Sequence, residues 1–283
     1  MPDIYLKKAD KTQMIKETFF TLTFSIGLFA SYSNKKFKQS LNYEHHAITF
    51  ADKIDSIVIA KMNQYNIPGL SIGVVKNDSI FYTKGYGVSS INNQKPVTEN
   101  SVFHTASVSK IFTALAIMNL VENKQLSLDD KLTTVLPKLR FSDKRADAIT
   151  IKTLLNHTSG VADVNSYHWS NNNQANNSLE NYLIHEDFQL EFEPSSKYKY
   201  CNLGYDILVY AIAQVSGLGF EGYVKKNILL PSSMTQSDFR FFEITDTLKT
   251  FPHTENWLSK NIYQRNTYPY TREHPAVHSI RLQ

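Results

Sequence analysis

The chain has 283 residues, of which 42% are hydrophobic and 20% charged, a balance typical of one large or two small globular domains. Its formal net charge is +4, and its lysines and arginines are scattered, which argues against a nucleic-acid partner. The single cysteine, Cys201, excludes an internal disulfide, and the nine histidines lack zinc-ligand spacing, so we expect no metal and no cofactor.

The N-terminal extension, residues 1–34, has the pattern of a signal peptide. Lys11 and Lys16 precede an uncharged stretch whose apolar heart runs from Phe19 to Ala30. That heart is shorter than the roughly 20 residues that a membrane span needs. We therefore expect export to the periplasm or secretion, with no stable membrane span after cleavage. The alternative is that this stretch forms a buried helix of the mature fold.

We expect the mature domain to cover residues 45–283 and to begin with a helix and a hairpin. Residues 45–66 have helical periodicity, and Pro68 and Gly69 end the pattern. The face expected to be apolar comprises Ile48, Ala51, Ile54, Ile57, Val58 and Met62. From Gly69 to Gly87, two β-rich runs flank Lys76-Asn77-Asp78, which predicts a hairpin.

The rest of the chain, residues 107–235, is mostly helical in pattern. Its breaks fall at Pro137, Gly160, Pro194 and Gly217. Strands followed by helices predict an α+β fold with segregated layers rather than βαβ units. We expect the helical block to bury its own apolar surface, through Ile111, Leu115, Met118, Leu120 and Val121 among others.

A serine and a lysine stand one turn apart where a long apolar helix begins. Ser107 and Lys110 are spaced so that both side chains lie on one face of the helix. A serine there is a nucleophile if a neighbour takes its proton, and burial favours the neutral, proton-accepting form of a lysine. The alternative is a helix cap beside a surface lysine. A second SxxK at Ser33 in "YSNKK" shows that the spacing alone is weak evidence for a catalytic site.

Two downstream motifs strengthen the catalytic interpretation. They are "LLNHTSGVAD", Leu154 to Asp163, and "FEPSSKYKYCNLGYDIL", Phe192 to Leu208. With Ser107-Val108-Ser109-Lys110 as SxxK and Tyr200-Cys201-Asn202 as YxN, the chain resembles the serine β-lactamase and penicillin-binding superfamily, specifically its class C-like branch. The resemblance covers about residues 45 to 274. It implies a β-lactamase/transpeptidase-like α+β fold, in which a helical domain packs on an antiparallel sheet.

The resemblance also assigns roles to four residues. Ser107 would be the nucleophile that forms an acyl-enzyme, while Lys110 and Tyr200 would be the catalytic groups that share its proton. Asn202 would hold Lys110 and bind the substrate's amide side chain. The implied substrate is a small molecule or peptide with a β-lactam, D-Ala-like or ester group, and the motifs do not choose between these. Cys201 is expected to face away from the site, and His157 to be a hydrogen-bonded structural residue.

The branch has a third motif, KTG or HxG, on a strand that supplies an oxyanion N–H. The sequence contains neither after Asn202, so we expect an incomplete domain with the C-terminal sheet strands missing. Losing one oxyanion donor costs about 10²–10³ in rate. A reading-frame slip after His274 is compatible with one set of codons that the genetic code allows for residues 275–281. Two alternatives therefore stand beside an impaired hydrolase: a non-catalytic protein that binds cell-wall peptide, and an inactive product of a frame-shifted gene.

Overall fold

The computed structural model describes residues 49–164, 173–240 and 243–265, together with 272, 275, 281 and 282. These residues all belong to one unit, Ile48–Gln283. The predicted signal-like extension, residues 1–34, lies outside the described residues. Within them, no single helix is both long and apolar enough to cross a membrane, although one bent helix pair, Asn202–Ser216 with Phe220–Leu229, has the length and composition.

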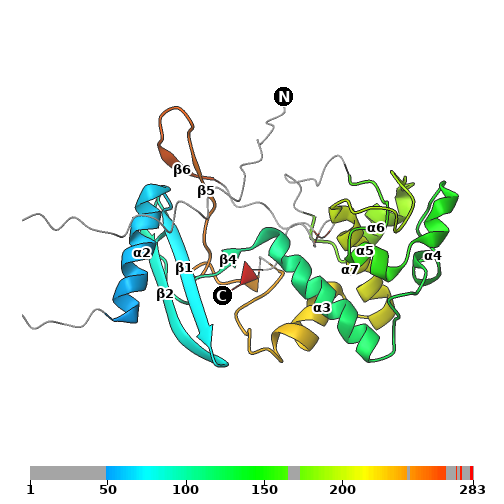
Figure 1. Cartoon of the computed structure of the whole chain (residues 1–283), viewed down its shortest axis with the longest axis horizontal. Helices are drawn as coiled ribbons and strands as arrows, with labels where there is room; N and C mark the ends of the chain where they lie inside the picture. The colour runs from blue at the N-terminus through cyan, green and yellow to red at the C-terminus, as the bar shows by residue number, and fades with distance from the viewer. Residues whose placement is uncertain are drawn as a thin grey trace, which may run out of the picture. The chain divides into compact units, whose positions relative to one another are not determined.

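The described chain begins with a helix that packs on a hairpin (Figure 1). Helix α2, Phe50–Gln64, starts with a capping box in which the Thr49 and Asp52 side chains each bond the other's backbone N–H. Strands β1, Gly69–Lys76, and β2, Ser79–Ser90, pair antiparallel from Gly69↔Gly87 to Lys76↔Ser79.

The hairpin turn is the one that the sequence predicts. Asn77 and Asp78 have φ of 51° and 55°, the backbone of a two-residue turn that matches the twist of the strands. A short strand, β3 at Lys95–Pro96, extends the sheet in the order β1-β2-β3. Among the described strands, β1 therefore pairs with β2 alone.

The predicted apolar face of α2 is only partly correct. Val58 and Met62 are buried with Tyr86, and Ile54 packs against them. Ile57 is 63% exposed, because helical periodicity places it at the edge of this narrow contact.

The Asp55 carboxylate links α2 to the hairpin through hydrogen bonds and an ion pair. Asp55 accepts hydrogen bonds from the hydroxyls of Tyr82 and Tyr86 at 2.7 and 2.6 Å, and the Lys84 ammonium lies 2.6 Å from its other oxygen. The bonds from Lys84, Tyr86 and Tyr82 lower the pKa of Asp55 from 3.8 to about 2.

This cluster predicts an acid-sensitive step in stability. A carboxylate with a depressed pKa stabilises the fold above its unfolded pKa of 3.8, and that stabilisation is lost as pH falls toward about 2. We expect the unfolding midpoint of the wild type to fall more steeply over this window than that of Asp55→Asn. Urea unfolding against pH measures the difference, with Asp129→Asn, an exposed carboxylate elsewhere, as the control. Parallel curves for wild type and Asp55→Asn would contradict the assignment.

The helical block is built around two long helices, α3, Ser109–Glu122, and α7, Asn202–Ser216, which pack against each other. Ten consecutive residues of α7, from Leu203 to Ile212, are buried. Gly217 ends α7 with φ of 68°, as the predicted break requires. The shorter helices are α4 (Leu132–Val135), α5 (Ile151–Leu155), α6 (Ser178–His185) and α8 (Phe220–Val224), with 3₁₀ turns at Ala106–Val108 (η1) and Lys144–Ala148 (η2) and a π turn at Lys225–Leu229 (η3).

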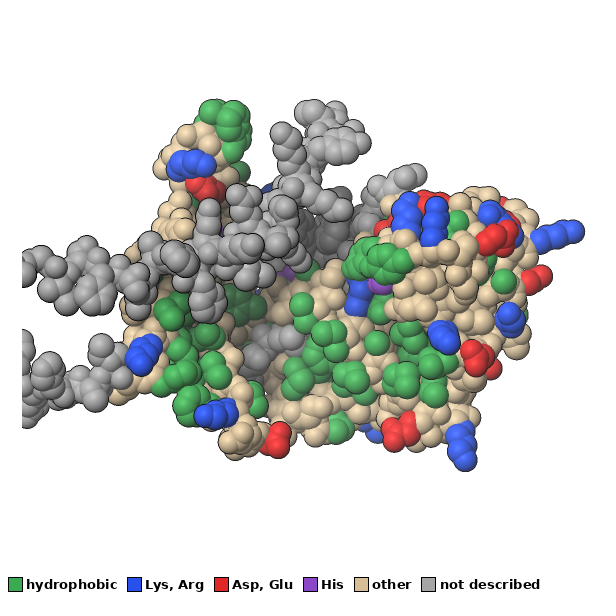
Figure 2. Space-filling model, in the orientation of Figure 1, with side chains coloured by type: hydrophobic (Ala, Val, Ile, Leu, Met, Phe, Trp, Pro, Cys, Tyr) green, Lys and Arg blue, Asp and Glu red, His purple; other side chains and the backbone are tan. Residues whose placement is uncertain are grey.

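The expected core of α3 is partly wrong. Ala116, Ile117 and Leu120 are buried, but Ile111, Leu115 and Met118 are 58%, 46% and 45% exposed. Figure 2 shows apolar side chains at the surface where α3 runs in Figure 1. The helix is apolar nearly all round, so its sequence does not specify which stripe faces the core.

Short strand pairs complete the described chain. β4, Phe103–His104, pairs antiparallel with β7, Arg281–Leu282, and β5, His253–Glu255, pairs antiparallel with β6, Ile262–Gln264. The 251–264 segment also bonds to the end of β2. Phe251 N–H donates to Ser89 O at 3.0 Å, and the Ser90 hydroxyl donates to Gln264 at 2.6 Å.

Candidate active site

The predicted nucleophile lies in a tight turn immediately before α3. Ser107 belongs to η1, Ala106–Val108, rather than to the first turn of the α-helix itself. Ala106 has φ of 46°, and its carbonyl accepts a hydrogen bond from the Ser109 hydroxyl. This turn leaves Ser107 exposed to solvent, whereas Lys110, three residues on, is only 6% exposed.

The predicted nucleophile contacts the predicted tyrosine, which lies 93 residues later in the sequence. The Tyr200 hydroxyl donates a hydrogen bond to Ser107 Oγ at 2.9 Å. The Lys110 ammonium lies 5.4 Å from the centre of the Tyr200 ring and 5.5 Å from that of Tyr205, within the range of cation–π attraction. The Tyr205 hydroxyl donates to Leu155 O at 3.0 Å, which fixes the second ring. Ser107, Lys110 and Tyr200 thus share one small region.

Asn202 is held by an aspartate that the sequence reasoning did not single out. Asn202 is the first residue of α7, and its backbone N–H donates to Asp163 at 3.3 Å. Its side-chain amide nitrogen lies 3.5 Å from the same carboxylate oxygen, and Leu203 N–H donates to the other oxygen at 3.0 Å. Asp163 therefore caps the positive N-terminus of α7 and orients Asn202.

Asp163 is the last residue of the "LLNHTSGVAD" motif, and that loop runs beside the segment leading to Tyr200. Glu191 N–H donates to Gly160 O and Ser195 N–H to Thr158 O, each at 2.8 Å. Gly160 has φ of 80°, and a Cβ there would lie 2.1 Å from Phe192 O. Only glycine fits this close approach, which sets where the segment carrying Tyr200 lies.

Cys201 is a packed residue, as the sequence predicts. It is 4% exposed, and its sulfur accepts a hydrogen bond from Gly204 N–H at 3.4 Å as the cap of α7. Burial, with the nearby Asp163 charge, raises the pKa of its thiol to about 12. A thiol in this state is not a nucleophile at neutral pH.

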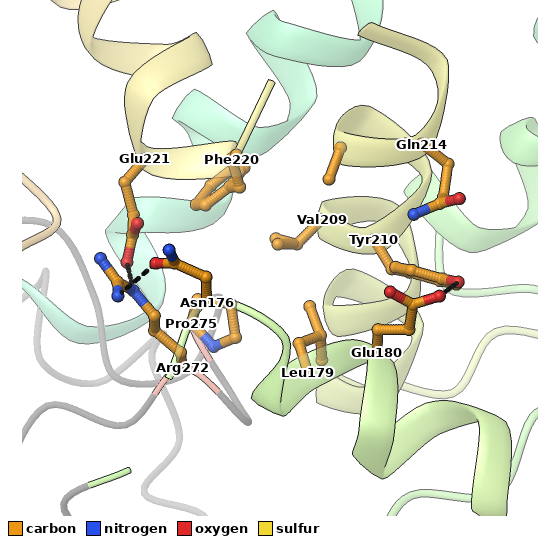
Figure 3. Close-up of a pocket in the computed structure, with 12 residues that line it drawn as sticks. Asn176, Leu179, Glu180, Val209, Tyr210, Gln214, Phe220, Glu221, Arg272 and Pro275 are labelled. Carbon is orange, nitrogen blue, oxygen red and sulfur yellow. Dashed lines mark hydrogen bonds and ion pairs between the residues drawn. The ribbon is translucent and has the colours of Figure 1, made fainter. Parts of the chain in front are cut away.

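A separate cavity of about 450 Å³ lies between α6, α7 and α8 (Figure 3). Ser107, Lys110, Tyr200 and Asn202 do not line it. Its charged groups already have partners, since Glu180 accepts from Lys138 and Tyr210, and Glu221 from Arg272. Saturated polar groups give a ligand little to recognise, so we assign no catalytic role to this cavity.

Comparison with known proteins identifies the family of the chain. The family model described as Beta-lactamase matches residues 54–251, which include Ser107, Lys110, Tyr200 and Asn202. The chain belongs to the beta-lactamase family. The fold is accordingly the β-lactamase/transpeptidase-like one, with helices and an antiparallel sheet, as the resemblance implies.

The curated relatives of the chain include a penicillin-binding protein. The chain is 32% identical over 192 residues to Protein flp of Staphylococcus aureus (strain NCTC 8325 / PS 47), an alignment that covers 66% of this chain and 38% of that protein. It is 33% identical over 162 residues to Penicillin-binding protein 4* of Bacillus subtilis (strain 168), covering 56% and 35%. The alignments therefore span well under half the length of these relatives.

Solved structures show the same fold. An octameric penicillin-binding protein homologue from Pyrococcus abyssi superposes with a TM-score of 0.69 at 28% identity, over 83% of this chain and 54% of that one. A class C beta-lactamase in complex with cefoxitin gives 0.66 at 22% identity, over 82% and 61%.

Proposed function

We propose that this chain is a serine hydrolase that works through an acyl-enzyme, with Ser107 as nucleophile. The observation that carries the proposal is the 2.9 Å hydrogen bond from the Tyr200 hydroxyl to Ser107 Oγ, beside the buried Lys110 ammonium. A serine hydroxyl becomes nucleophilic when a neighbouring group takes its proton, and in the proposal Tyr200 accepts it in the deprotonated, phenolate form.

The reaction follows from these contacts. With Tyr200 as the phenolate and Lys110 as the ammonium, Ser107 Oγ attacks the carbonyl carbon and its proton passes to the phenolate oxygen, which reverses the direction of the hydrogen bond between them. As the tetrahedral intermediate collapses, the bond from the carbonyl carbon to the leaving nitrogen or oxygen breaks, and the pair returns the proton to the leaving atom. Water then attacks the acyl-enzyme, which releases a carboxylic acid and restores the Ser107 hydroxyl.

The proposed substrates carry a β-lactam, a D-Ala-like peptide or an ester group. Asn202, held by Asp163, stands at the start of α7, where a side-chain amide can bind the substrate's own amide. The relative named above as a penicillin-binding protein and the match to the Beta-lactamase family model support this class. The signal-like residues 1–34 favour action outside the cytoplasm, where such peptides occur.

The family's third motif supplies an oxyanion N–H, and the given residues after Asn202 contain no KTG or HxG sequence. A protein without that donor is expected to turn over about 10²–10³-fold more slowly. The same observation favours the second candidate function, a protein that binds cell-wall peptide without turning it over.

A fluorescent penicillin tests the proposal. Wild-type protein is expected to form a covalent adduct that survives denaturation, and Ser107→Ala is expected to abolish it. Ser33→Ala, which removes the serine of the other SxxK sequence, serves as the matched control and is expected to label like the wild type. An adduct on Ser107→Ala, or no adduct on the wild type, would overturn the assignment.

A further inference from the structure

His157 bonds the chain on both sides of Tyr200. Its carbonyl accepts the N–H of Lys199 at 2.9 Å, and its ring nitrogen Nδ1 accepts the N–H of Cys201 at 3.2 Å. The imidazole also packs on the tyrosine, with ring centres 4.5 Å apart. One residue therefore fixes the backbone before and after Tyr200 and the ring between them.

These contacts specify the protonation state of His157. An N–H that donates to Nδ1 needs an unprotonated nitrogen, so the ring is neutral and carries its proton on Nε2. Adding a proton to Nδ1 would place its N–H directly against the N–H of Cys201, so neither could accept a hydrogen bond from the other. The Cys201 amide would then lose its partner, and an unpaired backbone N–H in a partly buried place is costly.

Several elements that pack against the His157 imidazole place charged or titratable groups around it. Lys110 lies on α3, Tyr205 on α7 with its ring centre 5.1 Å away, and Tyr198 on the preceding segment at 5.9 Å. Burial and the Lys110 charge lower the pKa of His157 below 6.5, and the Asp163 charge opposes them. The direction of this shift favours the neutral imidazole that the Cys201 hydrogen bond requires.

We propose that His157 is a positioning residue for Tyr200. Its neutral imidazole holds the phenol against Ser107 Oγ, and its protonation releases the phenol and slows acylation. This inference rests on the proposed function, because it concerns the step in which Ser107 is acylated. Protonation of His157, rather than of Lys110 or Tyr200, would therefore lower the rate of acylation at acidic pH.

Two substitutions separate positioning from titration. In His157→Asn, the side-chain oxygen occupies nearly the place of Nδ1, accepts from Cys201 and does not titrate. Asparagine also suits the φ of 60° at this position. His157→Leu removes the acceptor altogether. His185→Asn, on α6, is the control for a histidine outside the site.

The experiment measures the rate of penicillin labelling from about pH 5 to pH 8, with the fold of each variant checked by circular dichroism. We expect the wild type and His185→Asn to lose rate toward the acid end of this range, as His157 is protonated, and His157→Asn to lose this dependence. We expect His157→Leu to be about tenfold slower throughout. An acid limb that persists in His157→Asn, or a wild-type rate in His157→Leu, would overturn the inference.

An independent measurement keeps this inference separate from the proposed function. The Cys201 amide resonance is expected to shift with pH as His157 titrates in the wild type, and not in His157→Asn. A shift without any penicillin adduct would mean that the hydrolase assignment is wrong while the hydrogen bond from Cys201 N–H to His157 is correct. A Cys201 amide resonance that does not change as His157 is protonated would contradict the role proposed for His157.

Discussion

Tyr200→Phe is expected to slow acylation of the protein by about 10²–10⁴-fold, the range typical of a positioned acid–base group. The substitution removes the hydroxyl that donates to Ser107 Oγ at 2.9 Å and keeps the ring that contacts His157 and faces Lys110. Because the packing survives, the free energy of unfolding should change little while the chemistry is lost.

The rate of penicillin labelling against concentration measures this effect. Tyr198→Phe is the matched control, because Tyr198 is 66% exposed and contacts the edge of the same imidazole. It is expected to label at nearly the wild-type rate. A Tyr200→Phe rate within about threefold of the wild type would show that the phenol takes no part in proton transfer.

Gly160→Ala is expected to destabilise the fold and to abolish labelling as well. A side chain at φ of 80° costs about 1–2 kcal/mol on its own, and the new Cβ would meet Phe192 O at 2.1 Å. The segment from Phe192 toward Tyr200 must then move away from the 157–163 loop. We expect a total loss of about 3 kcal/mol or more in the free energy of unfolding.

Gly217→Ala is the control that separates the cost of the steric clash from the cost of backbone strain. Gly217 has φ of 68°, but a Cβ there would meet nothing within 4 Å. It should cost only the strain, about 1–2 kcal/mol, and leave labelling intact. Urea unfolding of both variants gives the comparison, and equal losses for the two would contradict the role given to the Phe192 contact.

Much of the site could be predicted because its chemistry lies in short local patterns. The SxxK spacing alone singles out Ser107 and Lys110, although Ser107 lies in the turn before α3, and the Asn77-Asp78 turn sets the hairpin. Tyr200 could be joined to them only through resemblance to a family. Nothing in periodicity brings together two residues separated by 93 positions, as these are.

The parts that were missed depend on long-range contacts. Asp163 caps α7 from 39 residues away, and an aspartate in a loop is more often a local cap, so its sequence gives no sign of this role. The exposed stripe of α3 is missed for a different reason. In a helix that is apolar nearly all round, only the neighbouring elements decide whether Ile111 or Ile117 faces the core.

The measurement that tests the hydrolase assignment most directly is a time course of intact mass and peptide mapping after penicillin is added to the 283-residue protein. The proposed mechanism predicts an adduct on the peptide that contains Ser107, followed by its slow loss as hydrolysed penicillin accumulates. A stable adduct on Ser107 without product would support binding without turnover. An adduct on any other residue, or product formed equally by Ser107→Ala, would contradict Ser107 as the nucleophile.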